Sequence, residues 1–160
     1  MSELDKIDAD IVNLLVEDGR MPCAEIARRV GEISERSVRY RLKRLTAEGI
    51  IKIAANVIPA QIGYPIIADV WLIVDSDKIL DVARKMTTYE CISYVACSIG
   101  ENDVSVQVVG RDTSEVYRFV TEVIGKTPGV RKTTTSIVPI VLKDTHQWRV
   151  PTLECMPEDN

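Results

Sequence analysis

Residues 1–50 carry apolar side chains at the three- and four-residue spacing of amphipathic helices. Three short helices are predicted, over residues 5–18, 22–30 and 34–48. Each begins at a residue suited to a helix start and is followed by a glycine, which favours a helix end. The starts are Asp5, Pro22 and Ser34, and the glycines are Gly19, Gly31 and Gly49.

The hydrophobic period changes to two after Gly49, where residues 50–58 (IIKIAANVI) alternate in the manner of a strand. Residues 59–65 (PAQIGYP) hold two prolines and a glycine and are predicted to be a linker. The predicted organisation is a helical domain (1–50), a hinge strand with the linker (51–64), a second domain (65–144) and a polar tail (145–160).

The second domain alternates strand and helix patterns. In order, IIADVWLIVD predicts a strand, DKILDVARKMTTY a helix, CISYVACSIG and DVSVQVVG two strands, DTSEVYRFVTEVIG a helix and GVRKTTTSIVPIVL a last strand. This βαββαβ order is that of ferredoxin-like domains, so the predicted class is α+β. Several strands are apolar at both parities, although two helices cover only one face of such a sheet. The other face is therefore expected to meet a partner.

Composition excludes several functions. One Phe and two Trp argue against a stacking platform for single-stranded nucleic acid. Four cysteines without a CxxC pair, and one histidine, give no zinc site, and no cofactor is expected. The charged start MSELDKIDAD is not a signal peptide, and no apolar run approaches the roughly 20 residues of a membrane span. A cytoplasmic protein with reduced thiols, and with no membrane partner, is expected.

The charge is unevenly distributed. Residues 1–60 hold ten basic and ten acidic side chains, whereas residues 61–160 hold ten and fourteen. Within the first part, residues 36–44 contribute five positive charges and no negative one. Such a local cluster indicates a nucleic-acid contact more strongly than the overall charge of −4 argues against one.

On a helical wheel the third predicted helix is apolar on one side and basic on the other. Such a helix in a helix-turn-helix enters the major groove of double-stranded DNA with its N-terminal half. Arg36 and Arg39 are placed to reach base edges, and Lys43 and Arg44 to reach phosphates, while Ser37 and Tyr40 suit either contact. The alternative is a solvated basic face without a function.

Five runs in order, over residues 4 to about 144, resemble the Lrp/AsnC family of transcription regulators. They are LDKIDADIVNLLVEDGR, AEIARRVG, SVRYRLKRLTAEGIIK, IGEND and PGVRKTTTSIV. The resemblance implies an N-terminal winged helix-turn-helix, a hinge strand and a C-terminal ferredoxin-like (RAM) domain that senses a small molecule. It also implies a homodimer made by pairing the C-terminal sheets and assembling into tetramers or octamers.

The resemblance also implies an effector site for an amino acid or a related metabolite. Carried over, its residues are Gly100, Glu101, Asn102 and Asp103 in the loop between the two central strands, with Thr133 and Thr135 on the last strand. Asn102 stands where the family has a tyrosine, Pro22 stands where it often has a serine, and the turn before Ser34 is one residue longer. The alternative for GEND is a plain hairpin turn.

The predicted function is sequence-specific, ligand-responsive transcription regulation without catalysis. Sirohaem decarboxylases have a related architecture and are the enzymatic alternative. The one histidine, His146, follows the last predicted strand. No nucleophile–base pair or phosphate-binding glycine loop is present in the sequence. A third alternative is an effector-holding oligomer that has lost DNA binding, which the five-charge cluster argues against.

Overall fold

The computed structural model describes residues 4–151, which form two compact units. The helical unit contains the chain up to Asn56 together with the segment from Leu142 onward, and the sheet unit contains Val57–Val141. The first division falls inside the predicted hinge segment 51–64. The chain returns to the helical unit after Val141, which the sequence did not indicate. Residues 152–160 of the predicted tail lie outside the described residues.

The helical unit contains α1 (Lys6–Glu17), α2 (Cys23–Val30) and α3 (Glu35–Ala47), each within a few residues of its predicted bounds. Asp5 caps α1 in a capping box, because its carboxylate accepts from the Asp8 N–H while the Asp8 carboxylate accepts from the Asp5 N–H. The three helices enclose the fully buried side chains of Ile11, Ile26 and Val38. The core of this unit is therefore small.

The segment from Leu142 onward joins the helical unit through α1. It contains the short 3-10 helix η3 (Thr145–Gln147). The Asn13 side chain accepts from the Val150 N–H at 2.8 Å and donates to the Val150 carbonyl at 3.1 Å. Arg149 pairs with Glu17 at 3.0 Å. These contacts fix the position of the segment 142–151 on α1.

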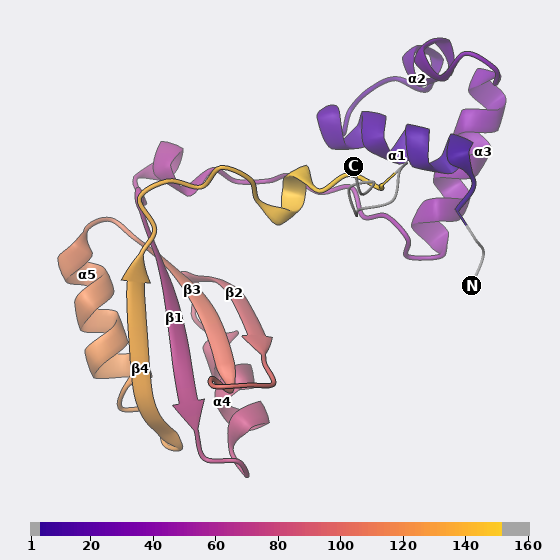
Figure 1. Cartoon of the computed structure of the whole chain (residues 1–160). Coiled ribbons are helices and arrows are strands. Elements are labelled where there is room, and N and C mark those ends of the chain that lie inside the picture. Colours follow the sequence, from indigo (N-terminus) through magenta and orange to yellow (C-terminus); the bar gives the residue numbers. More distant parts are fainter. Residues whose placement is uncertain (1–3, 152–160) are drawn as a thin grey trace, which may run out of the picture. The chain divides into compact units, whose positions relative to one another are not determined.

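The sheet unit contains four antiparallel strands in the order β2-β3-β1-β4, which Figure 1 shows as neighbouring arrows. The elements after the 3-10 turn η1 (Pro59–Ile62) are β1 (Ile66–Val74), α4 (Ile79–Met86), β2 (Ile92–Cys97), β3 (Val104–Gly110), α5 (Thr113–Arg118), its π-helical continuation η2 (Phe119–Ile124) and β4 (Val130–Ile137). The predicted α+β class and ferredoxin-like order are confirmed.

Both helices cover the same face of this sheet. Alternate β1 residues, including Val70 and Leu72, are fully buried together with Met86 of α4 and Ile124 of η2. The opposite face carries Ile67, Trp71 and Ile73 of β1, which are only half-buried. The polar residues Asp69 and Gln107 lie on the same open face and hydrogen-bond to each other at 3.0 Å, so this face is uncovered as predicted but only partly apolar.

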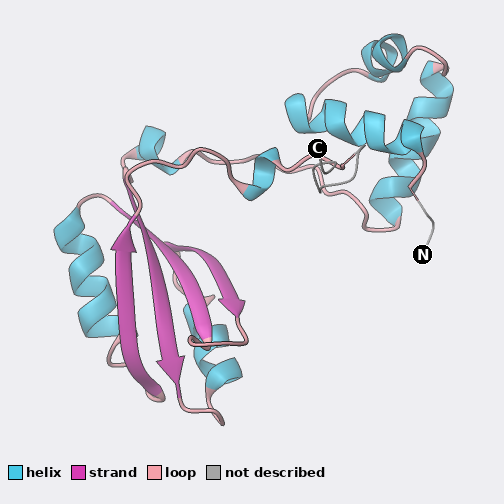
Figure 2. Ribbon diagram, in the orientation of Figure 1, coloured by secondary structure: helices cyan, strands magenta, loops and turns pink. Residues whose placement is uncertain are grey.

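The predicted strand over residues 50–58 does not form within a single chain. Residues 51–58 form no strand and are drawn as loop in Figure 2. The side chains of Ile53, Val57 and Ile58 are more than half exposed. An alternating pattern creates only the possibility of a strand, because a strand also needs a neighbour for its N–H and C=O groups. Among residues 4–151 this segment has no such neighbour.

Candidate nucleic-acid interface and effector loop

Helix α3 presents a fixed face to solvent because its opposite face is pinned to the core. The Ser34 hydroxyl caps the helix by accepting from the Ser37 N–H at 3.2 Å. Val38 and Leu45 are fully buried, and Leu42 packs against the same core. The predicted pinning of this helix is confirmed.

Four of the six predicted DNA-binding side chains lie together on the exposed face of α3. Arg36, Arg39, Tyr40 and Lys43 are exposed, and Tyr40 retains 72% of its accessible surface. Arg39 pairs with Glu35 one turn earlier, an exposed contact that DNA phosphates could replace. Among residues 4–151, Arg36 and Lys43 have no ion pair. This face therefore offers cations and an aromatic hydroxyl to a duplex.

The other two predicted residues are placed differently. Ser37 is half-buried beside the capping turn. Arg44 turns toward α1, where its guanidinium pairs with the carboxylate of Asp8. Arg41, which the sequence did not single out, lies on the same side and pairs with Asp5 at 2.6 Å and with Asp8 at 2.8 Å. The five-charge cluster is thus divided between two sides of the helix.

This network changes the acid–base properties of Asp5 and Arg41. The hydrogen bond from Arg41, with the Asp8 N–H second, lowers the pKa of Asp5. The same contacts with Asp5 and Asp8 raise the pKa of Arg41. The sequence did not indicate that Asp8 belongs to such a network. The available signal was the three-residue spacing of Arg41 and Arg44, which places both on one helix face.

The predicted effector loop joins β2 to β3. Gly100 has φ 145°, which disfavours other residues, and Glu101 is exposed. Asp103 is fixed by three contacts: its N–H donates to the Leu72 carbonyl at 2.9 Å, its carbonyl accepts from Ser98 at 2.8 Å and its carboxylate accepts from the Val74 N–H at 2.8 Å. Asp103 therefore holds the loop against β1, and GEND is more than a simple turn.

Thr133 and Thr135 do not join this loop within one chain. They lie on β4, which is at the opposite edge of the sheet from β2. With Tyr117 and Thr121 they line a hollow of about 570 Å³ between β4 and the α5–η2 helix. The six predicted effector residues are therefore separated into two groups.

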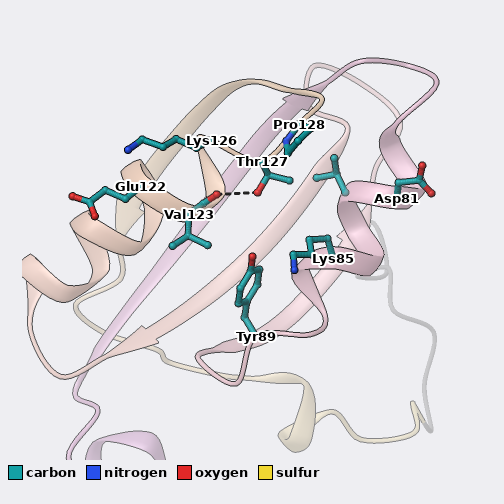
Figure 3. A pocket seen from close by; sticks show the side chains of 9 residues that line it. Asp81, Lys85, Tyr89, Glu122, Val123, Lys126, Thr127 and Pro128 are labelled. Carbon is teal, nitrogen blue, oxygen red and sulfur yellow. Dashed lines mark hydrogen bonds between the residues drawn. The ribbon is translucent and has the colours of Figure 1, made fainter.

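A second hollow, of about 450 Å³, lies between α4 and η2 (Figure 3). Tyr89 and Thr127 lie near its middle, whereas Asp81, Glu122 and Lys126 extend away from it. The Thr127 hydroxyl donates to the Val123 carbonyl at 2.9 Å, so it is already satisfied. Lys85 lies over the Tyr89 ring at 5.2 Å.

Other chemistry finds little support. Over residues 4–151 no group of His, Cys, Asp and Glu could hold a metal ion, and no helix is long and apolar enough to cross a membrane. His146 is exposed on η3, which belongs to the helical unit. Cys155 lies outside the described residues.

Comparison with known proteins also divides the chain between residues 52 and 68. Residues 4–52 match a family model described as winged helix-turn-helix DNA-binding, and residues 68–148 match one described as the Lrp/AsnC ligand binding domain. An uncharacterised helix-turn-helix-type transcriptional regulator of Pyrococcus horikoshii is 37% identical over 142 residues, which are 88% of this chain and 89% of that protein.

Two further similarities extend the comparison. The helix-turn-helix-type transcriptional regulator FL11 of Pyrococcus furiosus is 35% identical, over 92% of this chain and 97% of that protein. A crystal structure of a Neisseria meningitidis transcriptional regulator in complex with L-methionine superposes with a TM-score of 0.83 at 26% identity, covering 91% of this chain and 96% of that one. Both similarities span the helical and the sheet units.

Proposed function

Because this chain belongs to the Lrp/AsnC family of transcriptional regulators, with a DNA-binding and a ligand-binding domain, we propose that α3 is its recognition helix. The observation that carries the proposal is the exposed face with Arg36, Arg39, Tyr40 and Lys43 opposite a buried apolar face. Arg36 and Arg39 near the helix start read base edges, and Lys43 meets a phosphate. Ser37 supports the N-terminal turn. The protein acts in the cytoplasm, where its operators lie.

The test is binding to the intergenic DNA upstream of its own gene across a salt series. Each phosphate contact contributes a slope of about −0.9 to log K against log salt. Lys43→Ala should reduce the magnitude of this slope by about 0.9, because one counterion-releasing contact is lost. Arg36→Ala should reduce discrimination between the operator and a scrambled duplex, by about 1–3 kcal/mol if it pairs with a base. Affinity of the wild type that does not change with salt would refute DNA binding through this face.

We further propose that a second copy of the chain covers the open face of the sheet. Half-buried Trp71 and Ile73 and the exposed Tyr94 leave large apolar groups in water on this face, beside the hydrogen-bonded pair of Asp69 and Gln107. The exposed, unpaired segment 51–58 would then have a partner of its own kind, and its alternating pattern would form a strand. Light scattering should give at least a dimer, with tetramers or octamers as higher states. Trp71→Asp should shift it toward the monomer.

The effector is proposed to be an amino acid or a related metabolite that binds at the loop Gly100–Asp103. The support is the fixed loop, the ligand-binding family model and the similarity to a regulator solved with L-methionine. Strand β1 lies between the loop and Thr133 within one chain, so Thr133 and Thr135 would contribute from a neighbouring copy. Thermal stability should rise with one or more of the twenty amino acids by mass action. Asp103→Ala should lose that rise, whereas Asp103→Asn is the matched control, because its side-chain oxygen can still accept from the Val74 N–H.

A further inference from the structure

The carboxylate of Asp8 is the one buried charged group described in the molecule. Its side chain retains 1% of its accessible surface, although α1 is an otherwise ordinary surface helix. A buried carboxylate is costly unless it is paired and hydrogen-bonded. Asp8 has two such partners, Arg41 and Arg44, and both come from α3. The packing of the recognition helix on α1 therefore includes a charged contact as well as an apolar one.

The two arginines that pair with Asp8 are largely shielded from solvent. The Arg41 and Arg44 side chains retain 22% and 29% of their accessible surface, whereas the Arg39 side chain retains 70%. The Nε of Arg44 is buried and has no acceptor within the part of the chain that the structure describes. An unsatisfied donor persists only where other contacts fix the group. Here the fixing contact is the pair with Asp8.

Building on the proposed function, we propose that Asp8 is a positioning residue for the recognition helix. It holds Arg41 and Arg44 against α1, and this fixes the axial rotation of α3. It also withdraws two of the five cations of residues 36–44 from DNA phosphates, leaving Arg36, Arg39 and Lys43 for the duplex. The role assigned to Arg44 is thus to orient the helix instead of binding a phosphate.

Holding Arg41 and Arg44 away from the DNA phosphates should affect how well the protein distinguishes its operator from other DNA. Cations that meet phosphates raise affinity for every sequence, whereas base contacts raise it for the operator alone. If all five cations were free, binding to non-specific DNA would gain most. A fixed rotation of α3 also keeps Arg36 and Arg39 aligned with base edges. Asp8 therefore acts on the ratio of operator to non-specific affinity, through groups that do not touch the DNA.

The test compares salt slopes on the operator and on a scrambled duplex, using the full chain. Arg44→Met and Arg41→Met keep the side-chain length without the charge, and they should leave the slope unchanged while lowering the melting temperature. Lys43→Ala is the matched control, with its slope smaller by about 0.9. Asp8→Asn frees Arg44, whereas Arg41 keeps its pair with Asp5, so the slope should become steeper by about 0.9 and the operator preference should fall several-fold.

The outcomes separate this inference from the proposed function. A wild type that binds without salt dependence would overturn both. Normal wild-type and Lys43→Ala slopes, with Arg44→Met losing as much slope as Lys43→Ala, would overturn only the role given to Asp8. An Asp8→Asn variant that is destabilised, with unchanged slope and preference, would make Asp8 a purely structural residue. If Asp8→Asn does not fold, the two methionine variants decide the question.

Discussion

The two units hold their functional segments in place by different means. In the helical unit, five buried apolar residues among those described and one buried carboxylate hold α3 in place. In the sheet unit, thirteen buried residues support the strands, and the loop before β3 is tied down by backbone groups. In a small core each buried side chain contributes a large fraction of the free energy of unfolding, whereas in a large core each contributes a smaller fraction. The DNA-facing unit should therefore be the more easily perturbed of the two.

The largest expected effect comes from removing a core side chain from each unit. Ile26→Ala and Leu72→Ala each delete a fully buried side chain, at a cost of about 2–5 kcal/mol. In the small helical unit this is a large share of the stability, so Ile26→Ala should unfold that unit while the sheet unit remains folded. Urea titration can follow both units, since Trp148 belongs to the helical unit and Trp71 to β1.

Variants with one of these tryptophans replaced by phenylalanine separate the two signals. Ile26→Ala should lower the urea midpoint reported by Trp148 far more than the midpoint reported by Trp71. Leu72→Ala should do the reverse. Coincident transitions in both variants would show that the two units unfold together, which would contradict the expected difference in their stability.

The second expected effect concerns backbone geometry in the sheet unit. Gly129 and Gly63 have similar positive φ values of 94° and 90°, which cost other residues about 1–2 kcal/mol. A Cβ on Gly129 would also lie 2.8 Å from the Cβ of Lys78, whereas one on Gly63 would meet nothing within 4 Å. Gly129→Ala should therefore destabilise the sheet unit more, by about a further 1–3 kcal/mol. Equal losses in the two variants, measured by thermal melting, would rule out the steric part of this explanation.

Much of this fold could be predicted from the sequence because its signals are local. Capping at Asp5 and Ser34, glycine stops and the change of hydrophobic period mark element boundaries, and the element order determines the ferredoxin-like topology. The exposed face of α3 followed from the same periodicity. These features depend on residues close together in the chain.

The rest depends on contacts between distant residues. The pairing of Asp8 with Arg44 spans thirty-six positions, and the contact of Asn13 with Val150 spans 137. Charge alone did not distinguish Arg44 from Lys43, because the difference is the carboxylate that faces one of them. Residues 51–58 form no strand within one chain for the same reason, because an alternating pattern does not show whether a second strand is available to pair with it. Thr133 and the loop at Gly100 are separated because strand order places them at opposite edges.

The third prediction concerns the return of the chain to the helical unit. Asn13→Ala removes two hydrogen bonds to Val150, at a cost of about 1–2 kcal/mol. It should release the segment 142–151, so that limited proteolysis cuts this segment faster than in the wild type. Asn13→Asp is the matched control, because its carboxylate still accepts from the Val150 N–H. A proteolysis rate in Asn13→Ala equal to that of the wild type would mean that other contacts seat the segment.

The smallest expected effect is a change in melting temperature on removing a charged contact at the start of α5 in the sheet unit. The Arg111 side chain, with its backbone N–H second, lowers the pKa of Glu115 to about 2. A carboxylate with a lowered folded pKa stabilises the fold above its unfolded pKa of about 4.3 and loses this contribution as the pH falls toward the folded value. Glu115→Gln should therefore melt below the wild type near pH 7, by a gap that narrows as the pH falls from about 4.3 to about 2. Since this pair is exposed, the gap should be small. Melting followed through Trp71 checks it, and a gap that stays constant over this range would assign the contact to hydrogen bonding without a contribution from charge.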